Sequence, residues 1–279
     1  MTINCKGICI NLSTPKVMGI LNITPDSFYD GGKYKSAKGI LNAVEKMRSD
    51  GATFVDIGAY SSRPGAQDIS EDEELHRILP IVDLILKAFP EVLLSIDTFR
   101  SSVAEKCLQA GAAMINDISG GKLDKKMMRV ISEFQVPYIL MHMRGTPQTM
   151  KAQTDYDDLI KTLIRYFSEQ VAEARQHKIN DIILDPGFGF AKTVSQNFTL
   201  LQHLDILKIL ELPMLVGISR KSMIYKTLNT TSKKALNGTT ALHMVALQHG
   251  ANILRVHDVR EAMECIRLHR QLEAAKLGE

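Results

Sequence analysis

The chain has 279 residues, of which 45% are apolar and 23% charged, so it can bury one large core and does not have the composition of a disordered protein. Its 34 basic and 31 acidic residues give a net charge of +3 with no long Lys/Arg block, which argues against a nucleic-acid partner and leaves a small phosphorylated ligand possible. The polar N-terminus and the lack of any apolar run of membrane-spanning length predict a cytoplasmic protein without a membrane partner.

The chain opens with "INCKGICINL", residues 3–12, whose alternation predicts a short β-hairpin that caps the bottom of the fold. Cys5 and Cys9 lie in this segment, and Cys107 and Cys265 lie far along the chain. None of the four has zinc-site spacing, so all are expected to be free thiols.

Eight apolar runs of strand length then follow in order. They are Val17–Ile23, Phe54–Gly58, Val92–Ile96, Met114–Asn116, Tyr138–Met143, Ile182–Leu184, Met214–Ile218 and Ile253–Val256. Their near-continuous apolar character is typical of parallel strands covered on both faces. Amphipathic stretches separate most of them, and Gly51, Gly111 and Gly250 each suit the end of a helix before the next strand. The pattern predicts an α/β protein, a single (β/α)₈ TIM barrel domain over residues 1–279. The alternative is a doubly wound open sheet, which normally carries a G-x-G-x-x-G turn that is missing here.

Polar residues gather where these strands end. In order they are Asn22, Asp56 with Ser62 and Arg63, Asp97, Asn116 with Asp117, Met141 to Met143, Asp185, Ser219 to Ser222, and Arg255 with His257 and Asp258. Any single one has a structural explanation, such as a helix N-cap for Asp97 or Asp185. Because the carboxyl ends of barrel strands share one face, the whole set predicts an active site there.

The residue types indicate what such a site would bind. Asp97, Asn116 and Asp185 offer carboxylates and an amide that suit paired hydrogen bonds to the edge of a flat heterocycle. Arg63, Lys221, Arg255 and His257, with Asn22, suit phosphate oxygens. The sequence therefore predicts a heterocycle slot beside an anion site.

At this point the motifs resemble a known family. "GILNITPDSFYDGG", "DIGAYSSRPGA", "SIDTFR", "MINDISGG", "LMHMRGTP", "ILDPGFGF", "VGISRKS" and "ILRVHDV" occur in order along essentially the whole chain and are together similar to the dihydropteroate synthases, which are pterin-binding enzymes. The resemblance implies a transferase of folate biosynthesis that displaces the pyrophosphate of 6-hydroxymethyl-7,8-dihydropterin pyrophosphate with p-aminobenzoate, assisted by Mg²⁺. It also implies a homodimer and a target of sulfonamides.

Residue roles follow from the same resemblance. It implies catalytic roles for Asp97, Lys221 and Arg255, and Asn22 as the Mg²⁺ ligand. Substrate contacts are expected from Asn116, Asp185, Met141 and Gly217 around the pterin, from Ser62, Arg63 and His257 at the pyrophosphate, and from Pro25, Phe28, Phe190 and Ser222 at the aminobenzoate. The loop from Asn22, with Gly31 and Gly32 as a hinge, is expected to be mobile and to complete the second substrate's pocket.

The chain departs from the family pattern at one place. Ala59-Tyr60-Ser61 stands where Gly-Glu-Ser is expected, so an acidic group is missing from the second loop.

Two other functions remain open: a methyltetrahydrofolate-dependent corrinoid methyltransferase, and a non-catalytic pterin-binding barrel. The first shares the pterin residues, but the Asn22 to Phe28 loop, "SRKS" and "RVHD" have no use without a leaving pyrophosphate; the second predicts loss of Asn22, Lys221 or Arg255, and all three are present.

Overall fold

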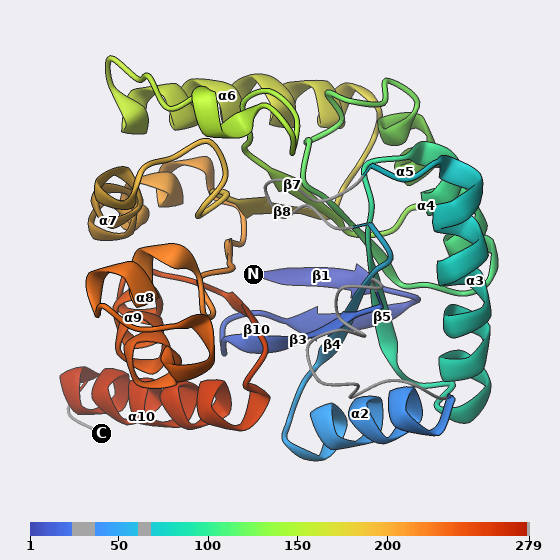
Figure 1. Ribbon diagram of the computed structural model, residues 1–279, viewed down its shortest axis with the longest axis horizontal. Helices are drawn as coiled ribbons and strands as arrows, with labels where there is room; N and C mark the ends of the chain where they lie inside the picture. The colour runs from blue at the N-terminus through green and yellow to red at the C-terminus, as the bar shows by residue number, and fades with distance from the viewer. Residues whose placement is uncertain (24–36, 61–67, 278–279) are drawn as a thin grey trace.

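Eight parallel strands form the centre of the molecule in the computed structural model, which describes residues 1–23, 37–60 and 68–277 (Figure 1). They are β3 (Lys16–Asn22), β4 (Phe54–Gly58), β5 (Leu93–Asp97), β6 (Met114–Asp117), β7 (Tyr138–Met141), β8 (Ile182–Asp185), β9 (Leu215–Val216) and β10 (Ile253–Val256). The sheet order is β8-β7-β6-β5-β4-β3-β10-β9. A parallel bridge between Leu184 and Met214 brings the two edges together. The predicted (β/α)₈ barrel is confirmed, and the open doubly wound sheet is excluded.

Helices surround the strands on the outside (Figure 1). They are α2 (Ala37–Ser49), α3 (Glu71–Ala88), α4 (Ser101–Gln109), α5 (Met127–Phe134), α6 (Leu159–Gln176), α7 (Val194–Gln202), α8 (Ser222–Thr227), α9 (Leu236–Gln248) and α10 (Val259–Leu277), with 3₁₀ turns η1 (Met150–Ala152), η2 (Leu204–Leu210) and η3 (Ser232–Lys234). Gly51, Gly111 and Gly250 have φ of 106°, 104° and 98° two residues beyond α2, α4 and α9. They terminate these helices as predicted.

The N-terminal hairpin is also present. β1 (Thr2–Cys5) pairs antiparallel with β2 (Ile8–Asn11) through the two-residue turn Lys6-Gly7, whose φ values of 53° and 79° fit a type I′ turn. The hairpin lies across the middle of the barrel (Figure 1). Its buried side chains pack against the first interior residues of the strands, in a cluster that contains Ile3, Cys5, Leu12, Met18, Phe54, Leu93, Met114, Ile139, Ile183, Leu215 and Ile253. The hairpin therefore closes the amino-terminal end of the barrel.

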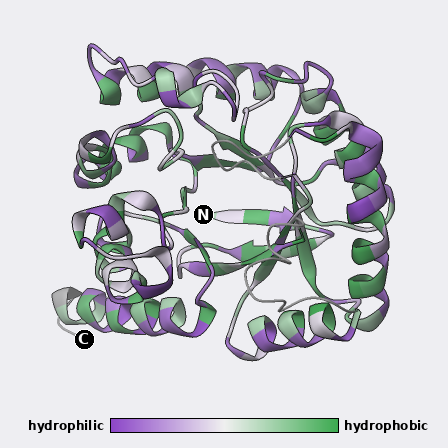
Figure 2. Ribbon diagram, viewed as in Figure 1, coloured by the Kyte–Doolittle hydropathy of each residue, from purple (hydrophilic) through white to green (hydrophobic). Residues whose placement is uncertain are grey.

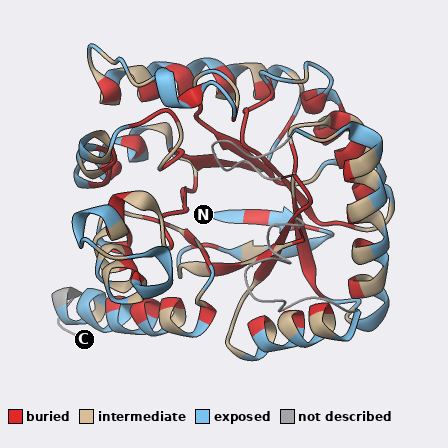
Figure 3. Ribbon diagram, viewed as in Figure 1, coloured by how far each residue is buried: buried red, intermediate tan, exposed pale blue. Residues whose placement is uncertain are grey.

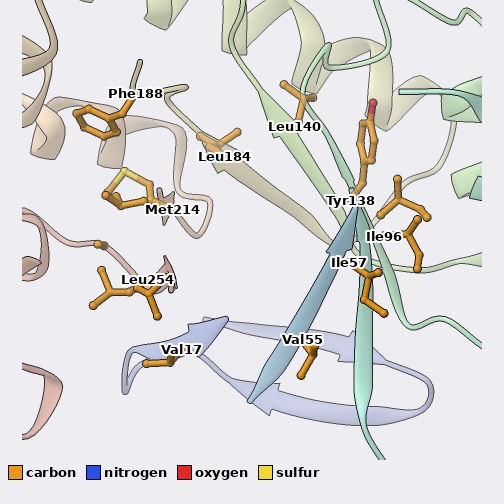
Figure 4. Packing of buried hydrophobic residues seen from close by; sticks show 14 of the residues in the cluster. Val17, Val55, Ile57, Ile96, Tyr138, Leu140, Leu184, Phe188, Met214 and Leu254 are labelled. Carbon is orange, nitrogen blue, oxygen red and sulfur yellow. The ribbon is translucent and has the colours of Figure 1, made fainter. Parts of the chain in front are cut away.

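The largest apolar cluster lies between the strands and the helices. Val55 and Ile57 of β4, Leu184 of β8 and Leu254 of β10 belong to it (Figure 4). The barrel strands are mostly buried, whereas the helices alternate between buried and exposed positions (Figure 3). The same alternation appears in the hydropathy of the helices (Figure 2). Within the described residues, no helix is long and apolar enough to cross a membrane.

Candidate active site

The alternation of side chains along each strand places the polar residues inside the barrel. Phe54, Ile139, Ile183 and Ile253 lie in the interior cluster at the closed end. Two residues further along the same strands come Asp56, Met141, Asp185 and Arg255. Asn116 and Gly217 likewise lie two residues beyond Met114 and Leu215 of that cluster. Asp97 and Asn22 lie four residues beyond Leu93 of β5 and Met18 of β3, on the same strand face. Because successive side chains point to opposite faces of a strand, all eight positions face the interior near the carboxyl-terminal mouth.

Arg255 forms the central ion-pair cluster of this mouth. Its Nη2 lies 2.5 Å from Asp56 Oδ2 and 2.7 Å from Asp97 Oδ2, and its Nε donates to Asp56 Oδ2 at 2.6 Å. Asn116 Nδ2 donates to the same Asp56 oxygen at 3.2 Å. Arg255 of β10 thus binds the carboxylates of Asp56 on β4 and Asp97 on β5. Asp56 also accepts a hydrogen bond from the side-chain amide of Asn116 on β6.

Burial changes the protonation behaviour of these groups. It raises the pKa of Asp97 to about 7, although the neighbouring Arg255 acts in the opposite direction. Burial alone would lower the pKa of Arg255, but Asp56 and Asp97 raise it above its usual value. Among the described residues, Asp56 Oδ1 and Asn116 Oδ1 are buried without a hydrogen-bond partner. Two acceptors are therefore free for the N–H groups of a bound molecule.

Asp185 and Lys221 form the opposite side of the mouth. Asp185 Oδ1 accepts a hydrogen bond from Gly187 N at 2.8 Å, and burial raises the pKa of Asp185 against the effect of Lys221. Lys221 donates to the carbonyl of Phe188, and its Nζ lies 4.8 Å from the centroid of the Phe190 ring. Burial lowers the pKa of Lys221 to about 8. A Cβ at Gly217 would lie 3.9 Å from both Lys221 Nζ and Arg255 Cβ, so Gly217 sits between the two cations.

The rim beside β9 and β10 carries His257, a further predicted anion-binding residue. His257 is exposed, its Nδ1 lies 3.0 Å from Ser219 Oγ, and its backbone N–H donates to the same oxygen. Arg220, with φ of 55°, makes a bidentate pair with Asp258 at 2.7 and 2.8 Å. This pair fixes the turn that presents Lys221 and begins α8 at Ser222.

Asn116 and Asp117 are adjacent in sequence, but the structure gives them different surroundings. Asp117 lies on the opposite strand face and accepts hydrogen bonds from Tyr138 Oη, from both the N–H and the hydroxyl of Ser119, and from Gly121 N, all at 2.7 to 2.8 Å. Its acceptor capacity is occupied within the fold. Asp117 therefore organises the loop after β6, and Asn116 alone faces the mouth.

Tyr60, the departure from the family pattern, is packed at the base of the second loop. Its ring stands edge-on to Phe99 with 5.0 Å between centroids, and Arg100 lies 5.3 Å above it. Its hydroxyl accepts a hydrogen bond from Gln148 Nε2 at 2.7 Å. An apolar ring replaces the expected carboxylate and links the loops that follow β4, β5 and β7.

Some predicted site residues cannot be placed. Pro25, Phe28, Ser62 and Arg63, with the predicted hinge Gly31-Gly32, lie outside the described residues. Asn22 ends β3 opposite Gly58 and is half-buried. Met141 is 2% exposed and packs with Met143, Met150 and the partly buried Phe190. The structure brings the other predicted residues together at one end of the barrel.

Two residues of this end are given no specific role by the sequence, although Asp56 belongs to the predicted set of polar strand ends. Asp56 is a fully buried carboxylate inside an otherwise apolar strand, and its partner Arg255 is 199 residues away. The presence of a charged residue within the apolar strand "FVDIG" could have indicated a role for Asp56 from the sequence. Lys192 is a buried lysine after β8 whose partners come from two loops. No spacing in the sequence points to it.

Comparison with known proteins gives a consistent result. The family model described as "Pterin binding enzyme" matches residues 18–257. A dihydropteroate synthase of Escherichia coli strain K12 is 42% identical over 278 residues, covering 99% of this chain and 98% of the relative. The structure of Yersinia pestis dihydropteroate synthase with a sulfonamide drug complex has a TM-score of 0.93 at 40% identity, covering 98% and 100% of the two chains. That of Xanthomonas albilineans dihydropteroate synthase with 4-aminobenzoic acid has a TM-score of 0.90 at 34% identity, covering 98% of each chain.

Proposed function

Since this chain belongs to the dihydropteroate synthases of the pterin-binding enzyme family, we propose that its mouth joins 6-hydroxymethyl-7,8-dihydropterin pyrophosphate to p-aminobenzoate. The C–O bond between the pterin methylene and pyrophosphate breaks, a C–N bond to the amine forms, and the amine gives a proton to water. The products are 7,8-dihydropteroate and pyrophosphate. The observation that carries this proposal is the meeting of acidic and amide acceptors with Arg255 and Lys221 inside one mouth.

The pterin ring would lie against the interior acceptors. Asp185 faces the mouth with one oxygen bound to Gly187 N and can offer the other to a ring N–H or exocyclic amine. Asn116 Oδ1 is a second buried acceptor that has no partner among the described residues. Met141 and the Cα of Gly217 would pack near the ring.

The chemical step would depend on charged side chains that are already in position before the C–O bond breaks. As the C–O bond breaks, the pterin methylene becomes electron-poor, and the carboxylate of Asp97 would stabilise the positive charge. Arg255 holds Asp97 in place at 2.7 Å and would also face the departing phosphate. His257 at the exposed rim and Lys221 are further cations or donors for the anion. An aromatic amine is unprotonated at neutral pH, so a dissociative displacement needs no strong general base.

The Mg²⁺ implied by the family would need ligands from the substrate pyrophosphate in addition to those from the protein. The described residues contain no group of three or more His, Cys, Asp or Glu side chains that could hold a metal ion. Mg²⁺ is commonly held by one or two protein oxygens plus substrate phosphates, and the Asn22 amide oxygen is a suitable hard ligand at the end of β3. When bound, the ion would neutralise charge on the leaving pyrophosphate.

The aminobenzoate would lie between Phe190, Lys221 and the start of α8 at Ser222. The roles of Pro25 and Phe28 in the first loop, and of Ser62 and Arg63 in the second, stay predictions. A sulfonamide, which resembles p-aminobenzoate in shape and charge, should compete for the same place.

A coupled assay for pyrophosphate release tests the function. Release should require both the dihydropterin pyrophosphate and p-aminobenzoate, should fall on chelation of Mg²⁺, and should be restored by added Mg²⁺. Reactions that omit one substrate provide the background. If the complete mixture releases no more pyrophosphate than this background, the proposal is wrong.

The chain is further proposed to act as a cytoplasmic homodimer. Exposed apolar side chains support a subunit contact: Ile206 and Ile209 on η2, Leu228 after α8, and Leu268 and Leu272 on α10. Free thiols at Cys5, Cys9, Cys107 and Cys265 are typical of a reducing compartment. Light scattering of the wild type and of Leu268→Glu/Leu272→Glu would test the dimer. The dimer is disproved if the wild type has the mass of a monomer, and the contact through α10 is disproved if the double variant is still a dimer.

A further inference from the structure

A buried lysine occupies the loop that connects β8 to α7. Lys192 is 7% exposed. Its Nζ donates to the carbonyl of Gly187 at 3.0 Å and to that of Phe190 at 3.1 Å, and it lies 3.0 Å from His142 Nδ1. Removing an amine from water is costly unless each of its hydrogen-bonding positions is used, and here three partners match the three donors of an ammonium group.

The loop needs these contacts because its backbone is irregular. Gly187, Gly189 and Ala191 have positive φ of 71°, 81° and 47°. Phe190 N donates to Gly187 O at 3.1 Å and closes a tight turn. Lys192 binds the carbonyls at both ends of that turn and clamps it, so the side chain of Phe190 is presented from a fixed backbone.

The third partner, His142, is itself held rigidly. Its ring stands edge-on to Tyr166 at 4.8 Å, and the Tyr166 hydroxyl donates to the carbonyl of Met141 at 2.7 Å. A side chain at Gly187 would collide with the carbonyl oxygen of His142, so the loop also packs directly on this residue. His142 thus connects the clamp to β7 and α6.

The contacts tolerate either protonation state of the lysine. Burial lowers the pKa of Lys192 to about 7 and that of His142 to about 2, so the imidazole stays neutral. A charged Lys192 donates to all three partners. A neutral one donates to the two carbonyls and accepts from His142 Nδ1–H, because imidazole can carry its proton on either nitrogen.

The clamped turn lies directly against Lys221. Lys221 Nζ binds the carbonyl of Phe188 and stands 4.8 Å from the centroid of the Phe190 ring. We infer that Lys192 and His142 form a positioning pair that holds the Phe188 to Phe190 wall, and through it Lys221, in the shape required by the aminobenzoate. This inference rests on the proposed function, and neither residue of the pair needs to touch a substrate.

The first test is Lys192→Met, which keeps the length and buried volume of the side chain and removes the clamp. The KM for p-aminobenzoate should rise about tenfold or more. The KM for the pterin substrate should change less than about threefold, because Asn116 and Asp97 are held by Asp56 and Arg255 and Asp185 keeps its own hydrogen bond from Gly187 N. Hydrogen exchange of the peptide covering residues 186–192 should become faster in the same variant. This readout does not depend on activity.

Lys122→Met is the matched control. Lys122 Nζ lies 4.4 Å from the centroid of the Tyr166 ring, which itself stands edge-on to His142. This variant therefore removes a lysine charge close to His142 without removing the carbonyl contacts of Lys192. Both KM values and the exchange of residues 186–192 should equal those of the wild type. An effect as large as that of Lys192→Met would mean that charge, and not the clamp, is responsible.

Changes at His142 keep the inference testable if Lys192→Met does not fold. His142→Asn offers an oxygen near the position of Nδ1 and should stay close to the wild type, whereas His142→Leu should shift the aminobenzoate KM in the direction of Lys192→Met. The inference is overturned if Lys192→Met, or His142→Leu in its place, leaves that KM and the loop exchange unchanged, or raises both KM values in parallel. An inactive wild type would instead refute the proposed function, and loop exchange would still test the clamp.

Discussion

At the scale of single residues, one side-chain oxygen of Asp185 accepts a hydrogen bond within the protein, and the other can accept one from a ligand. Its Oδ1 accepts from Gly187 N, which holds the start of the clamped loop, and its position on β8 directs it into the mouth. Asparagine at this position can keep the first contact through its amide oxygen. A substitution can therefore separate the support of the loop from the recognition of the ligand.

We predict that Asp185→Asn weakens pterin binding by a factor of about 30 to 100 while leaving the fold intact. The new amide would present its N–H groups toward the N–H groups of the ring. The hydrogen bond to the ring would be lost, and the facing donors of the protein and of the ring would both lack an acceptor. Isothermal titration with the pterin substrate measures the loss, and thermal unfolding controls for stability. An unchanged affinity would rule out the role assigned to Asp185.

Lys221 predicts a pH dependence. Burial lowers its pKa to about 8, so the free enzyme should lose the Lys221 charge as the pH rises through that value. Since kcat/KM reports the free enzyme, kcat/KM for p-aminobenzoate should fall on the alkaline side of pH 8. Lys221→Arg stays charged there and should be less active at pH 7 yet lack this alkaline decline. If the arginine variant declines in the same way, another group is titrating.

Sequence alone located most of the mouth because strand periodicity is local. The run that ends in Asn116 or Asp185 fixes which face the side chain occupies. It could not show that Asp117 is fully engaged, since Tyr138 lies on the next strand and the Ser119 contacts depend on the conformation of the loop after β6. The Arg255 to Asp56 pair and the Lys192 clamp join segments that only closure of the barrel brings together.

At the scale of elements, the expected strands and their order are correct. Phe54–Gly58 and Ile253–Val256 have the predicted bounds, and the other six strands differ by one or two residues at one or both ends. The run Val92–Ile96 becomes β5 at Leu93–Asp97, and Tyr138–Met143 ends as β7 at Met141. The expected Met214–Ile218 shortens to β9 at Leu215–Val216. Apolar residues continue past the last ladder bond into the loops, so hydrophobicity alone cannot mark where a strand stops.

Tyr60 tests how the loops at the mouth depend on one another. Tyr60→Phe removes the hydroxyl with its hydrogen bonds to Gln148 and Asp68 and should lower the free energy of unfolding by about 1 kcal/mol. Tyr60→Ala also removes the ring packed on Phe99 and should cost about 3 kcal/mol. Denaturant unfolding of both variants measures the difference. Equal losses would show that the ring contact contributes nothing.

At the scale of the whole molecule, stability and chemistry are placed at opposite ends of the barrel. The interior cluster under the hairpin is apolar, and the mouth contains buried ionisable groups that include Asp56 and Asp185. Leu12→Ala at the closed end should cost roughly 2 to 5 kcal/mol of unfolding free energy. Both KM values should stay at wild-type levels at a temperature where the variant is folded. Steady-state kinetics together with denaturant unfolding would test this separation, and altered KM values would contradict it.

His243 predicts a loss of stability in acid. Burial lowers its pKa to about 4, and neither of its ring nitrogens has a hydrogen-bond partner within the described residues. The unfolded chain binds a proton near pH 6.5, so from there down to about pH 4 the unfolded state holds more protons and is favoured, by roughly 3 kcal/mol at the lower limit.

The carboxyls of Asp97, Asp117 and Asp185 act in the opposite sense, because burial raises their pKa values. The measurement is therefore a difference between the wild type and His243→Leu. Chemical denaturation at several pH values should show the variant gaining relative stability as the pH falls from 6.5 to 4. A constant difference across this range would exclude His243 as the cause.

The hairpin also provides a site for immobilising the protein on a surface. Leu12 N donates to the carbonyl of Met1 at 2.9 Å, so the first residue is tied to the sealed end while its side chain remains exposed. A bead or sensor surface attached there would hold the barrel upright, with its opening facing the solution. The same attachment point tethers the molecule through the apolar layer under the hairpin, at the end of the barrel opposite Asp56, Asp185 and Arg255.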